Sequence, residues 1–334
     1  MNSKIPEEMR AVVMASPGGP EVLGVQQIPI PRPGPGKVLV KVSHIGVNQA
    51  DLLMRDADTP LPLTKLPGGP GMELAGTVVE VGEGVVEHQI GDRVCGLTGG
   101  NACAEYALVP HGLCFPIPDG HSNEEAAALT DGALTIWHSL FDPAVAKPGH
   151  TLLIHGGTSG ISIVGIILAR AFGIEVIATA GSDKKCAVID SLGVTRSINY
   201  RTTDFVAATQ EVTEGRGADV VLDMVGGPYL RRNIEATRAK GTLVMFGIMG
   251  GQVGDLDVLA VMTKNLSIRG SSIFFLDNLS KTAKAARMQE QIWPLLPKLP
   301  RPIIDSVFTL EETAAAQQRM AQGGHIGKIL ISTG

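Results

Sequence analysis

The sequence predicts an α/β protein in which a doubly wound parallel sheet accompanies a second, mostly antiparallel β domain. Two patterns lead to this prediction. The first ~125 residues form short β-like runs rich in Val, Gly and Pro, whereas strand-like and helix-like runs alternate from about residue 126 onward. With 334 residues, 44% of them hydrophobic, the chain is long and apolar enough to build two cores.

Residues 1–125 are expected to form the antiparallel domain. The stretches PRPGPG and PGGPG separate its strand candidates, because Pro and Gly favour the backbone angles of tight turns. The strand candidates are KVLVKVSHIGV (37–47), ELAGTVVEVG (73–82), DRVCGL (92–97) and AEYALVP (104–110).

Residues 126–270 alternate between apolar β-like runs and helical stretches, which predicts a parallel, doubly wound sheet. The most lipid-like stretch is ISIVGIILA (161–169), but nine residues cannot span a bilayer, so we expect a buried helix. The strand candidates are 151–155, 175–179, 195–199, 219–223, 241–246 and 266–270. The helix candidates are 159–172, 183–192, 203–213, 228–238 and 255–264.

The last part, residues 271–334, turns mixed again. We expect a helix over 279–293, a strand near 303–308, and a terminal strand in GKILIS. Thr309 and Glu312 have the spacing of a capping box, which predicts a helix start between those two strands. This segment is expected to complete the N-terminal β domain.

Charge and cysteine content exclude several classes of partner. The net charge is −5 and no block is dense in Lys or Arg, so nucleic acid is not expected as a ligand. The opening MNSKIPEEMR has no apolar segment of the kind that a secretory signal needs. Four cysteines without a Cys-x-x-Cys pair are typical of a reduced protein. We therefore expect a cytoplasmic protein without a membrane partner.

The stretch HGGTSGIS (155–162) predicts a dinucleotide-binding loop. A strand-like run leads into glycines and then into a helix, a context that lets the backbone approach a pyrophosphate. A glycine pair alone is equally compatible with a structural turn, but the six alternating strands favour cofactor binding. Ser162 stands where a third glycine is usual, and it is small enough for close helix–strand packing. The residues predicted to hold the pyrophosphate are Gly156, Gly157, Thr158, Ser159, Gly160 and Ile161.

The end of the second strand candidate indicates which dinucleotide binds. NAD sites place an acidic residue there, whereas this strand runs into AGSDKK. Ser182, Lys184 and Lys185 suit the 2′-phosphate of NADPH, and Asp183, the one opposing charge, is expected to face solvent as the cap of the next helix. The alternative is that SDKK is only a polar helix start.

Several stretches together resemble the zinc-free quinone oxidoreductases (NADPH:quinone reductase-like proteins) of the medium-chain dehydrogenase/reductase superfamily. The matching stretches include NQADLLMR (48–55), GMELAGTVVEVGEGV (71–85), GDRVCGL (91–97), AAALTDGALTIWHSL (126–140), HGGTSGI (155–161), LGVTRSINYRTTDF (192–205) and HIGKIL (325–330). The resemblance runs from about residue 11 to residue 331. It implies a GroES-like catalytic domain (1–125), an NADP-binding Rossmann domain (126–270) and a return segment (271–334), assembled as a homodimer through the Rossmann sheet.

The resemblance also implies roles for single residues. Asn48 would line the nicotinamide pocket, and Thr135 would lie near the cofactor's phosphate and nicotinamide. The further residues implied in NADPH binding are Ser182, Lys185 and Tyr200 at the 2′-phosphate, Phe246, Gly247, Ile248 and Met249 after the fifth strand, Ser272, Phe274 and Phe275 after the sixth, and Lys328. The alternatives are that Tyr200 only packs on the surface, and that Phe274 and Phe275 are ordinary core or dimer aromatics.

A metal is not expected. Zinc-dependent members of the superfamily carry Gly-His-Glu and an earlier ligand cysteine, where this chain has Gly71-Met72-Glu73 and Asn48. A thioether is not the imidazole that catalytic zinc normally takes, and the lobe of four closely spaced cysteines is missing.

Without a Lewis acid, the chemistry that fits best is hydride delivery from NADPH to an electrophilic quinone or conjugated enone. Close relatives place a tyrosine at about positions 58–60, where this chain offers Thr59, which can hydrogen-bond an oxyanion but is a poor acid. Two alternatives stay open. One is an enoyl-thioester or polyketide enoyl reductase, which the missing tyrosine weakens, and the other is a low-turnover NADPH-binding structural or redox-sensing protein.

Overall fold

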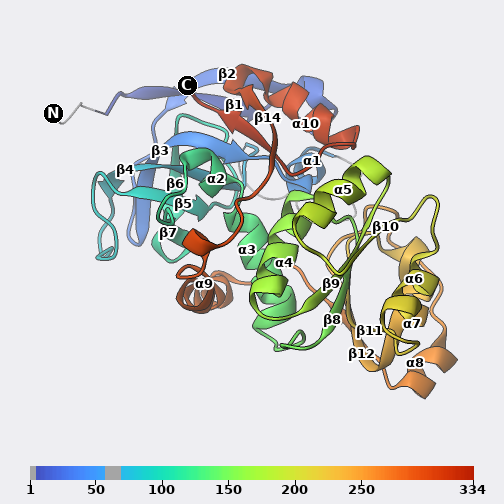
Figure 1. Cartoon of the computed structure of the whole chain (residues 1–334). Helices are drawn as coiled ribbons and strands as arrows, with labels where there is room; N and C mark the ends of the chain where they lie inside the picture. The colour runs from blue at the N-terminus through green and yellow to red at the C-terminus, as the bar shows by residue number, and fades with distance from the viewer. Residues whose placement is uncertain (1–4, 57–68) are drawn as a thin grey trace. The chain divides into compact units, whose positions relative to one another are not determined.

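The computed structural model describes residues 5–56 and 69–334 and divides into two compact units (Figure 1). Unit 1 comprises Met1–Asp131, Gln289–Pro297 and Arg301–Gly334, and unit 2 comprises Gly132–Met288 and Lys298–Pro300. The chain passes between the units at 131/132 and 288/289, and again at 297/298 and 300/301, whereas the boundaries expected from the sequence are 125/126 and 270/271. Thr59 lies outside the described residues.

Unit 2 is built on a six-stranded parallel sheet with the order β10-β9-β8-β11-β12-β13. Numbered along the chain this order is 3-2-1-4-5-6, that of a doubly wound dinucleotide-binding sheet, so the predicted fold is confirmed. Ligands of such sheets bind where the order reverses, here between β8 and β11. The strands are β8 (Thr151–Ile154), β9 (Glu175–Ala180), β10 (Arg196–Asn199), β11 (Ala218–Asp223), β12 (Thr237–Met245) and β13 (Ser267–Gly270).

The helices of unit 2 follow the predicted pattern with small differences at their ends. The helix expected over 228–238 stops at Ala236, because Thr237 already pairs with Ala218 as the first residue of β12. Helix α4 is buried from Ser162 to Ala169, as its apolar sequence predicts. The helices are α4 (Gly160–Ala171), α5 (Asp183–Ser191), α6 (Phe205–Val212), α7 (Leu230–Ala236) and α8 (Val258–Lys264).

Before β8 the chain forms α3 (Thr130–Ile136), which continues into a π-helical turn (Trp137–Phe141). Helix α3 begins in unit 1 and ends in unit 2, since the division falls after Asp131. Helix α9 (Asn278–Ile292) follows β13. Within the described ranges, none of the helices is both long and apolar enough to cross a membrane.

Unit 1 contains two sheets and confirms the predicted, mostly antiparallel architecture. Strands β1 (Glu8–Met14) and β2 (Leu23–Pro29) pair antiparallel. The larger sheet has the order β14-β15-β3-β4-β5-β7, with β6 also paired to β3, and among its described strands only β14 and β15 are parallel to each other. Its strands are β3 (Lys37–Gly46), β4 (Glu73–Val81), β5 (Arg93–Leu97), β6 (Tyr106–Pro110), β7 (Cys114–Pro116), β14 (Ile304–Thr309) and β15 (Lys328–Ser332). The helices of unit 1 include α1 (Gln49–Arg55), α2 (Asn123–Ala127) and α10 (Thr313–Ala321).

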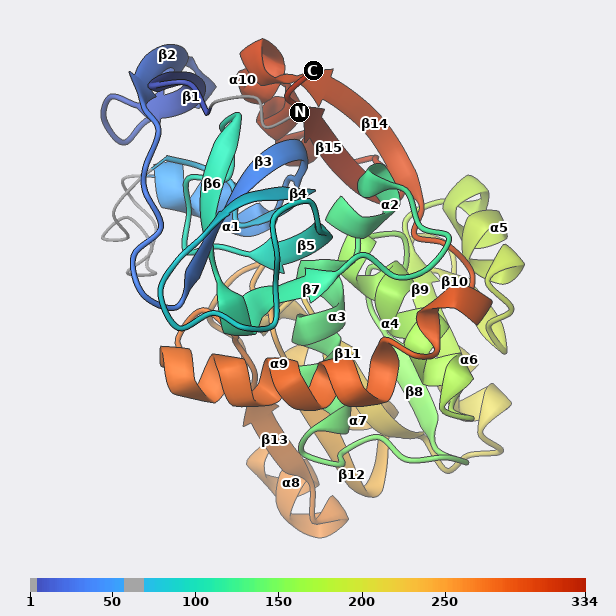
Figure 2. The ribbon, with the colours of Figure 1, turned by 90° about the vertical axis from the view of Figure 1, so that its left-hand side faces the viewer.

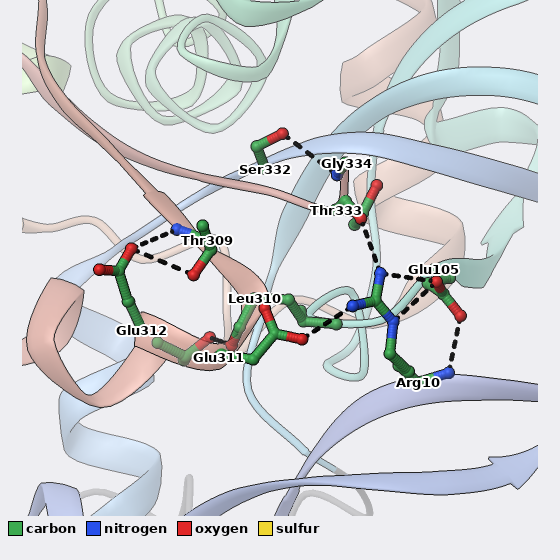
Figure 3. A network of polar contacts seen from close by, with 10 residues as sticks. Arg10, Glu105, Thr309, Leu310, Glu311, Glu312, Ser332, Thr333 and Gly334 are labelled. Atoms are coloured by element: carbon green, nitrogen blue, oxygen red, sulfur yellow. Dashed lines mark hydrogen bonds and ion pairs between the residues drawn. The ribbon is translucent and has the colours of Figure 1, made fainter.

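The C-terminal strands lie in the same sheet as β3, where β14 and β15 run side by side (Figure 2). Polar contacts hold this segment to the N-terminal strand β1. The Arg10 guanidinium donates to Glu105, to Glu311 and to the carbonyl of Thr333, at 2.8–3.1 Å (Figure 3). The capping box predicted for Thr309 and Glu312 is present (Figure 3). Strand β15 therefore brings Lys328 beside the residues that follow β3.

Candidate functional site

The glycine loop after β8 lies at the carboxyl edge of the parallel sheet and is closely packed. Gly156 has φ +62°, and a Cβ there would overlap the Met224 thioether. A Cβ at Gly157 would lie 2.7 Å from the Ile189 side chain, and the Gly157 N–H donates to the carbonyl of Thr179 at 2.8 Å. The positive φ of Gly156 strongly favours glycine there, and a side chain at Gly157 would crowd Ile189, so the loop is packed closely against its neighbours.

Helix α4 starts directly after this loop and offers donors to an anion. The Ser159 hydroxyl caps it by accepting from the N–H of Ser162 at 3.1 Å. The N–H groups of Gly160 and Ile161 have no acceptor within the helix, by the geometry of any helix start. The Ser162 hydroxyl donates to the carbonyl of His155 at 3.2 Å, so serine at the third glycine position stabilises the close helix–strand packing. The cradle fits a pyrophosphate group.

The carboxyl end of β9 lies next to the glycine loop at the same edge of the parallel sheet. Ser182 caps α5 by accepting from the N–H of Lys185 at 3.3 Å, so the cap is Ser182 and not Asp183. A Cβ at Gly181 would lie 2.8 Å from the Tyr200 hydroxyl and 3.5 Å from the Arg201 Nε. Tyr200 and Arg201 therefore both reach this strand end.

Of two charges at this strand end, Asp183 is exposed as expected, and Arg201 was not predicted. Asp183 is exposed and accepts a hydrogen bond from the Asn199 side chain at 2.8 Å, which directs it to β10. Arg201, an exposed cation beside Tyr200, was missed in the sequence reasoning. The sequence feature that could have predicted it is the pair Tyr200-Arg201 in INYR, which directly follows a strand. Lys185 is half-buried.

The remaining predicted cofactor residues of unit 2 also follow carboxyl strand ends. After β12, Phe246 donates its N–H to the carbonyl of Asp223, and Met249 to that of Met224. Phe275, after β13, is 55% exposed, whereas Phe274 is half-buried. The residues that follow carboxyl strand ends are Gly156, Gly157, Thr158, Ser159, Gly160, Ile161, Ser182, Lys185, Tyr200, Phe246, Gly247, Ile248, Met249, Ser272, Phe274 and Phe275. Thr135 instead lies buried on α3.

Behind the glycine loop, His155 forms a neutral buried network. Its Nδ1 lies 3.0 Å from the Thr179 hydroxyl and its Nε2 lies 2.8 Å from the Asn233 Oδ1. Its ring meets Phe205 and Tyr229 edge-on. Burial lowers the pKa of His155 to about 4, although the hydrogen bond with Asn233 opposes this. The imidazole is therefore neutral at physiological pH.

In unit 1, Asn48 and Lys328, both predicted from the resemblance, lie in direct contact. The Lys328 ammonium donates to the Asn48 Oδ1 at 2.6 Å and forms an ion pair with Glu73. The Asn48 amide donates to the Glu73 Oε1 at 3.0 Å. All three residues are at most 5% exposed. They meet because Asn48 begins α1 just after β3, Glu73 begins β4 and Lys328 begins β15, all beside β3.

Two further carboxyls complete a group that we name the unit-1 cluster: Asn48, Asp51, Glu73, Asp131 and Lys328. Asp51 accepts the N–H groups of Asn48 and Gly71, both at 2.8 Å, and Glu73 accepts that of Asp131 at 2.8 Å. Burial raises the pKa of Asp51 to about 6, although the two N–H groups and Lys328 oppose this. The predicted site did not contain Asp51, Glu73 or Asp131. Their only signal was the occurrence of acidic residues within apolar stretches.

Comparisons with known proteins place the chain in a family. It matches the profile "Alcohol dehydrogenase GroES-like domain" over residues 34–119 and the profile "Zinc-binding dehydrogenase" over residues 160–287. The "Synaptic vesicle membrane protein VAT-1 homolog" of Rattus norvegicus is 31% identical over 350 residues, which cover 98% of this chain and 84% of that protein. The chain belongs to the medium-chain dehydrogenase/reductase superfamily. It is an oxidoreductase of that superfamily, whose members bind a nicotinamide cofactor.

Other relatives confirm the quinone oxidoreductase-like resemblance. The "Quinone oxidoreductase" of Rattus norvegicus is 29% identical, covering 97% of both chains. A mycocerosic acid synthase-like polyketide synthase of Mycolicibacterium smegmatis is 32% identical over 97% of this chain, which is 15% of that protein. Among solved structures, an NAD-dependent alcohol dehydrogenase has a TM-score of 0.87 at 32% identity, covering 98% of this chain and all of that one. A mycobacterial protein complexed with NADPH has a TM-score of 0.86 at 26% identity, covering 97% and 99%.

Proposed function

We propose that this protein is an NADPH-dependent reductase that delivers hydride to a quinone or conjugated enone without a metal. The observation that carries this proposal is the buried contact of Lys328 with Glu73 and Asn48. An ammonium already neutralises the carboxylate there, so a divalent cation would have to displace it. Reduction of an electrophilic acceptor needs no such Lewis acid, whereas oxidation of an alcohol benefits from one.

Residues of unit 2 are proposed to hold the cofactor, which supplies the hydride when bound. The loop of Gly156 and Gly157 and the first N–H groups of α4 would bind the pyrophosphate. Ser182, Tyr200 and Arg201 would surround the 2′-phosphate, and Lys185 would add a second cation. Gly181 stands at the position where an acidic residue would favour NAD.

A metal-free site is supported by the residues themselves. Met72 is buried and offers only a thioether in the Gly-Met-Glu stretch. Within residues 5–56 and 69–334, no group of three or more His, Cys, Asp or Glu side chains is placed to hold a metal ion. We propose that activity survives a chelator, and stoichiometric zinc in the purified active enzyme would contradict this.

A second candidate is an enoyl reductase acting on thioesters of a polyketide type. It is favoured by the 32% identity to one segment of the mycobacterial polyketide synthase. Both candidates use the same cofactor and differ in the acceptor. An experiment must therefore distinguish quinone or enone acceptors from thioester acceptors.

We also propose that the protein acts as a homodimer in the cytoplasm. Strand β13 is an open edge of the parallel sheet, and Val258, Leu259 and Met262 of the neighbouring α8 are exposed apolar side chains. All four cysteines are free and buried, which suits a reducing compartment.

The test is a panel of quinones, conjugated enones and enoyl-CoA thioesters, with NADPH oxidation followed by absorbance in the presence of a chelator. We expect turnover with quinones or enones and a lower kcat/KM with thioesters. Preference for thioesters would favour the second candidate, and no turnover with any acceptor would contradict the reductase proposal.

A further inference from the structure

Four buried polar side chains lie at three neighbouring strand ends of unit 2. The strands have the order β9-β8-β11, and ligands of such sheets bind between the second and third of them. The four side chains, each at most 1% exposed, are those of Thr179 on β9, His155 directly after β8, Asp223 at the end of β11 and Asn233 on α7. They therefore lie on both sides of the point where the strand order reverses.

The hydrogen bonds among these side chains run in one direction. The His155 Nε2 donates to the Asn233 Oδ1 at 2.8 Å, because an amide oxygen only accepts. The other ring nitrogen, Nδ1, then accepts from the Thr179 hydroxyl at 3.0 Å. The Asn233 Nδ2 has no acceptor within hydrogen-bonding distance in the described part of the chain, but it faces the Asp223 carboxyl. A carboxylate there repels the amide oxygen, which keeps that oxygen on His155.

The same residues hold the backbone of the glycine loop. The Thr179 carbonyl accepts the Gly157 N–H at 2.8 Å, while the Thr179 hydroxyl bonds to the His155 ring. The His155 carbonyl accepts the Ser162 hydroxyl at 3.2 Å, in the first turn of α4. The loop is thus fixed at its middle and at both ends by residues that share one network. A shift of the His155 ring would move the residue from which the loop starts.

The loop after β11 is held in a similar way. The Asp223 carboxyl accepts the N–H groups of Val225 at 2.8 Å and of Gly226 at 3.1 Å. Met224 lies between these residues, and its thioether occupies the place that a Cβ of Gly156 would need. The loops after β8 and β11 therefore pack on each other, so a change in one loop displaces the other.

The His155 ring is enclosed by protein. It meets Phe205 and Tyr229 edge-on, with ring centroids 4.8 and 5.0 Å away, and the residue is 0% exposed. A side chain enclosed in this way acts on a ligand only through the backbone that it holds. Burying polar groups is unfavourable unless they are hydrogen-bonded, and the directional bonds that result impose a geometry that apolar packing would not.

We propose that His155 and Asn233 are positioning residues for the cofactor: the hydrogen bond between them holds the glycine loop in the conformation that binds the pyrophosphate. This role rests on the proposed binding of NADPH at that loop. The pyrophosphate is common to NADPH and NADH, so breaking the network weakens both cofactors alike. The fragment 2′-AMP has no pyrophosphate, so its contacts at the carboxyl end of β9 remain.

The test compares Asn233→Leu, which removes the acceptor of the His155 ring, with two variants of Thr179. Thr179→Val keeps the size of the side chain but removes its hydroxyl, whereas Thr179→Ser keeps the hydroxyl. We expect Asn233→Leu and Thr179→Val to raise the dissociation constants of NADPH and NADH by the same factor, about three- to tenfold for the lost hydrogen bond. Thr179→Ser should bind both cofactors as the wild type does. The dissociation constant of 2′-AMP should stay unchanged in all three variants.

The matched control is Thr213→Val, which removes a buried hydroxyl at the opposite edge of the same sheet. The Thr213 hydroxyl donates to the carbonyl of Thr209 at 2.7 Å and accepts the N–H of Gly217, just before β11, at 2.9 Å. This variant should lose stability but keep the affinities for NADPH, NADH and 2′-AMP. An equal loss of cofactor affinity in Thr213→Val would show that general loosening of unit 2 is the cause, and would overturn the inference.

A measurement on the wild type keeps the inference testable if Asn233→Leu does not fold. Nitrogen NMR of the cofactor-free protein, with the His155 signals assigned by their loss in His155→Gln, should show the hydrogen on Nε2. Thr179→Val should shift the Nδ1 signal, because that nitrogen loses its donor. A hydrogen on Nδ1 in the wild type would contradict the network as described.

The outcomes distinguish this inference from the proposed function. If the wild type binds NADPH but Asn233→Leu and Thr179→Val keep its affinity, the inference is wrong and the function stands. The same holds if these variants lose 2′-AMP together with the cofactors, since the effect then does not pass through the pyrophosphate loop. If the wild type binds neither NADPH nor NADH, the proposed function fails and takes the inference with it.

Discussion

The two units bury polar groups in opposite ways. The unit-1 cluster contains three carboxyls and one ammonium, each at most 5% exposed. The His155 network of unit 2 is neutral, with an imidazole between a hydroxyl and an amide. In unit 1 the interior holds an ion pair, Lys328 with Glu73, and burial raises the pKa of the neighbouring Asp51 and Asp131. In unit 2 burial lowers the pKa of His155 to about 4, so its imidazole stays uncharged at neutral pH.

This difference shows which buried network is suited to chemistry. The neutral network satisfies its ring nitrogens with uncharged partners, so its best role is to hold the loop after β8 in place. The charged cluster has three carboxyls and one ammonium, and burial raises the pKa of Asp51 and of Asp131, so its charge is sensitive to pH. The comparison therefore predicts different responses of the two units to mutation and to pH.

The largest expected effect is the loss of the buried cation. Lys328→Met removes the ammonium that pairs with the buried Glu73 carboxyl, and it should lower the free energy of unfolding by about 3–5 kcal/mol. Urea denaturation at pH 7.5 measures this. The matched control is Lys184→Met at an exposed position, which should change stability by less than about 0.5 kcal/mol. A loss below about 1 kcal/mol for Lys328→Met would show that the cluster is not held by its charge.

The second effect concerns acid. His155 has a pKa of about 4 when folded and about 6.5 when unfolded, so the unfolded chain binds more protons between these values. Stability is therefore lost as the pH falls through this window, by about 3 kcal/mol in full. In His155→Gln this loss should disappear. Urea denaturation between pH 7 and pH 4 checks it.

Asp131→Asn is the opposite control for this pH experiment. The folded pKa of Asp131 is raised to about 7, so the folded protein binds the extra proton and stability falls as the pH rises from about 4 to 7. Removing this group should flatten the loss on the alkaline side, whereas His155→Gln flattens the loss on the acid side. If both variants flatten the same side of the curve of stability against pH, the contrast between the units is wrong.

The parallel sheet was predictable in detail, and the unit-1 cluster was not. The strands and helices of unit 2 follow from local patterns of apolar residues, which the sequence displays directly. Strands β1 and β2 are harder, because β2 (LGVQQIP) has no clear alternation and depends on its pairing with β1. The unit-1 cluster joins α1, β4, α3 and β15, which are far apart in sequence. The contacts between its charged side chains exist only after folding has brought these four segments together, so the sequence alone does not predict them.

The cofactor residues show the same limit. The glycine loop was predicted because it lies within one strand–turn–helix segment. Arg201 was missed because its approach to Gly181 depends on the turn after β10, which brings two separate strand ends together. The roles of Asn48, Thr135 and Lys328 in cofactor binding stay predictions, as does that of Thr59 outside the described residues.

The third effect concerns Lys185, a charge that is less buried than Lys328 and that we propose binds the cofactor. Lys185 is half-buried at the start of α5, so Lys185→Ala should change stability little. A hydrogen bond to a charged group contributes about 1.5–3 kcal/mol, so NADPH affinity should fall by roughly ten- to a hundredfold. NADH lacks the 2′-phosphate, and its affinity should barely change. The ratio of the two dissociation constants, from fluorescence titration, is the measurement; an equal loss for both cofactors would make Lys185 structural.

The smallest effect is expected at Arg201. Its guanidinium is exposed, so water and salt screen its attraction to the 2′-phosphate more than at Lys185. Arg201→Ala should therefore weaken NADPH binding by about three- to tenfold at low ionic strength. This loss should shrink as salt is added, because exposed charges interact through screened solvent. Arg216→Ala, which removes another exposed cation of unit 2 after α6, is the matched control and should leave the affinity unchanged. A salt-independent loss, or an equal loss of NADH affinity, would show that Arg201 acts by shaping the turn after β10 and not by its charge.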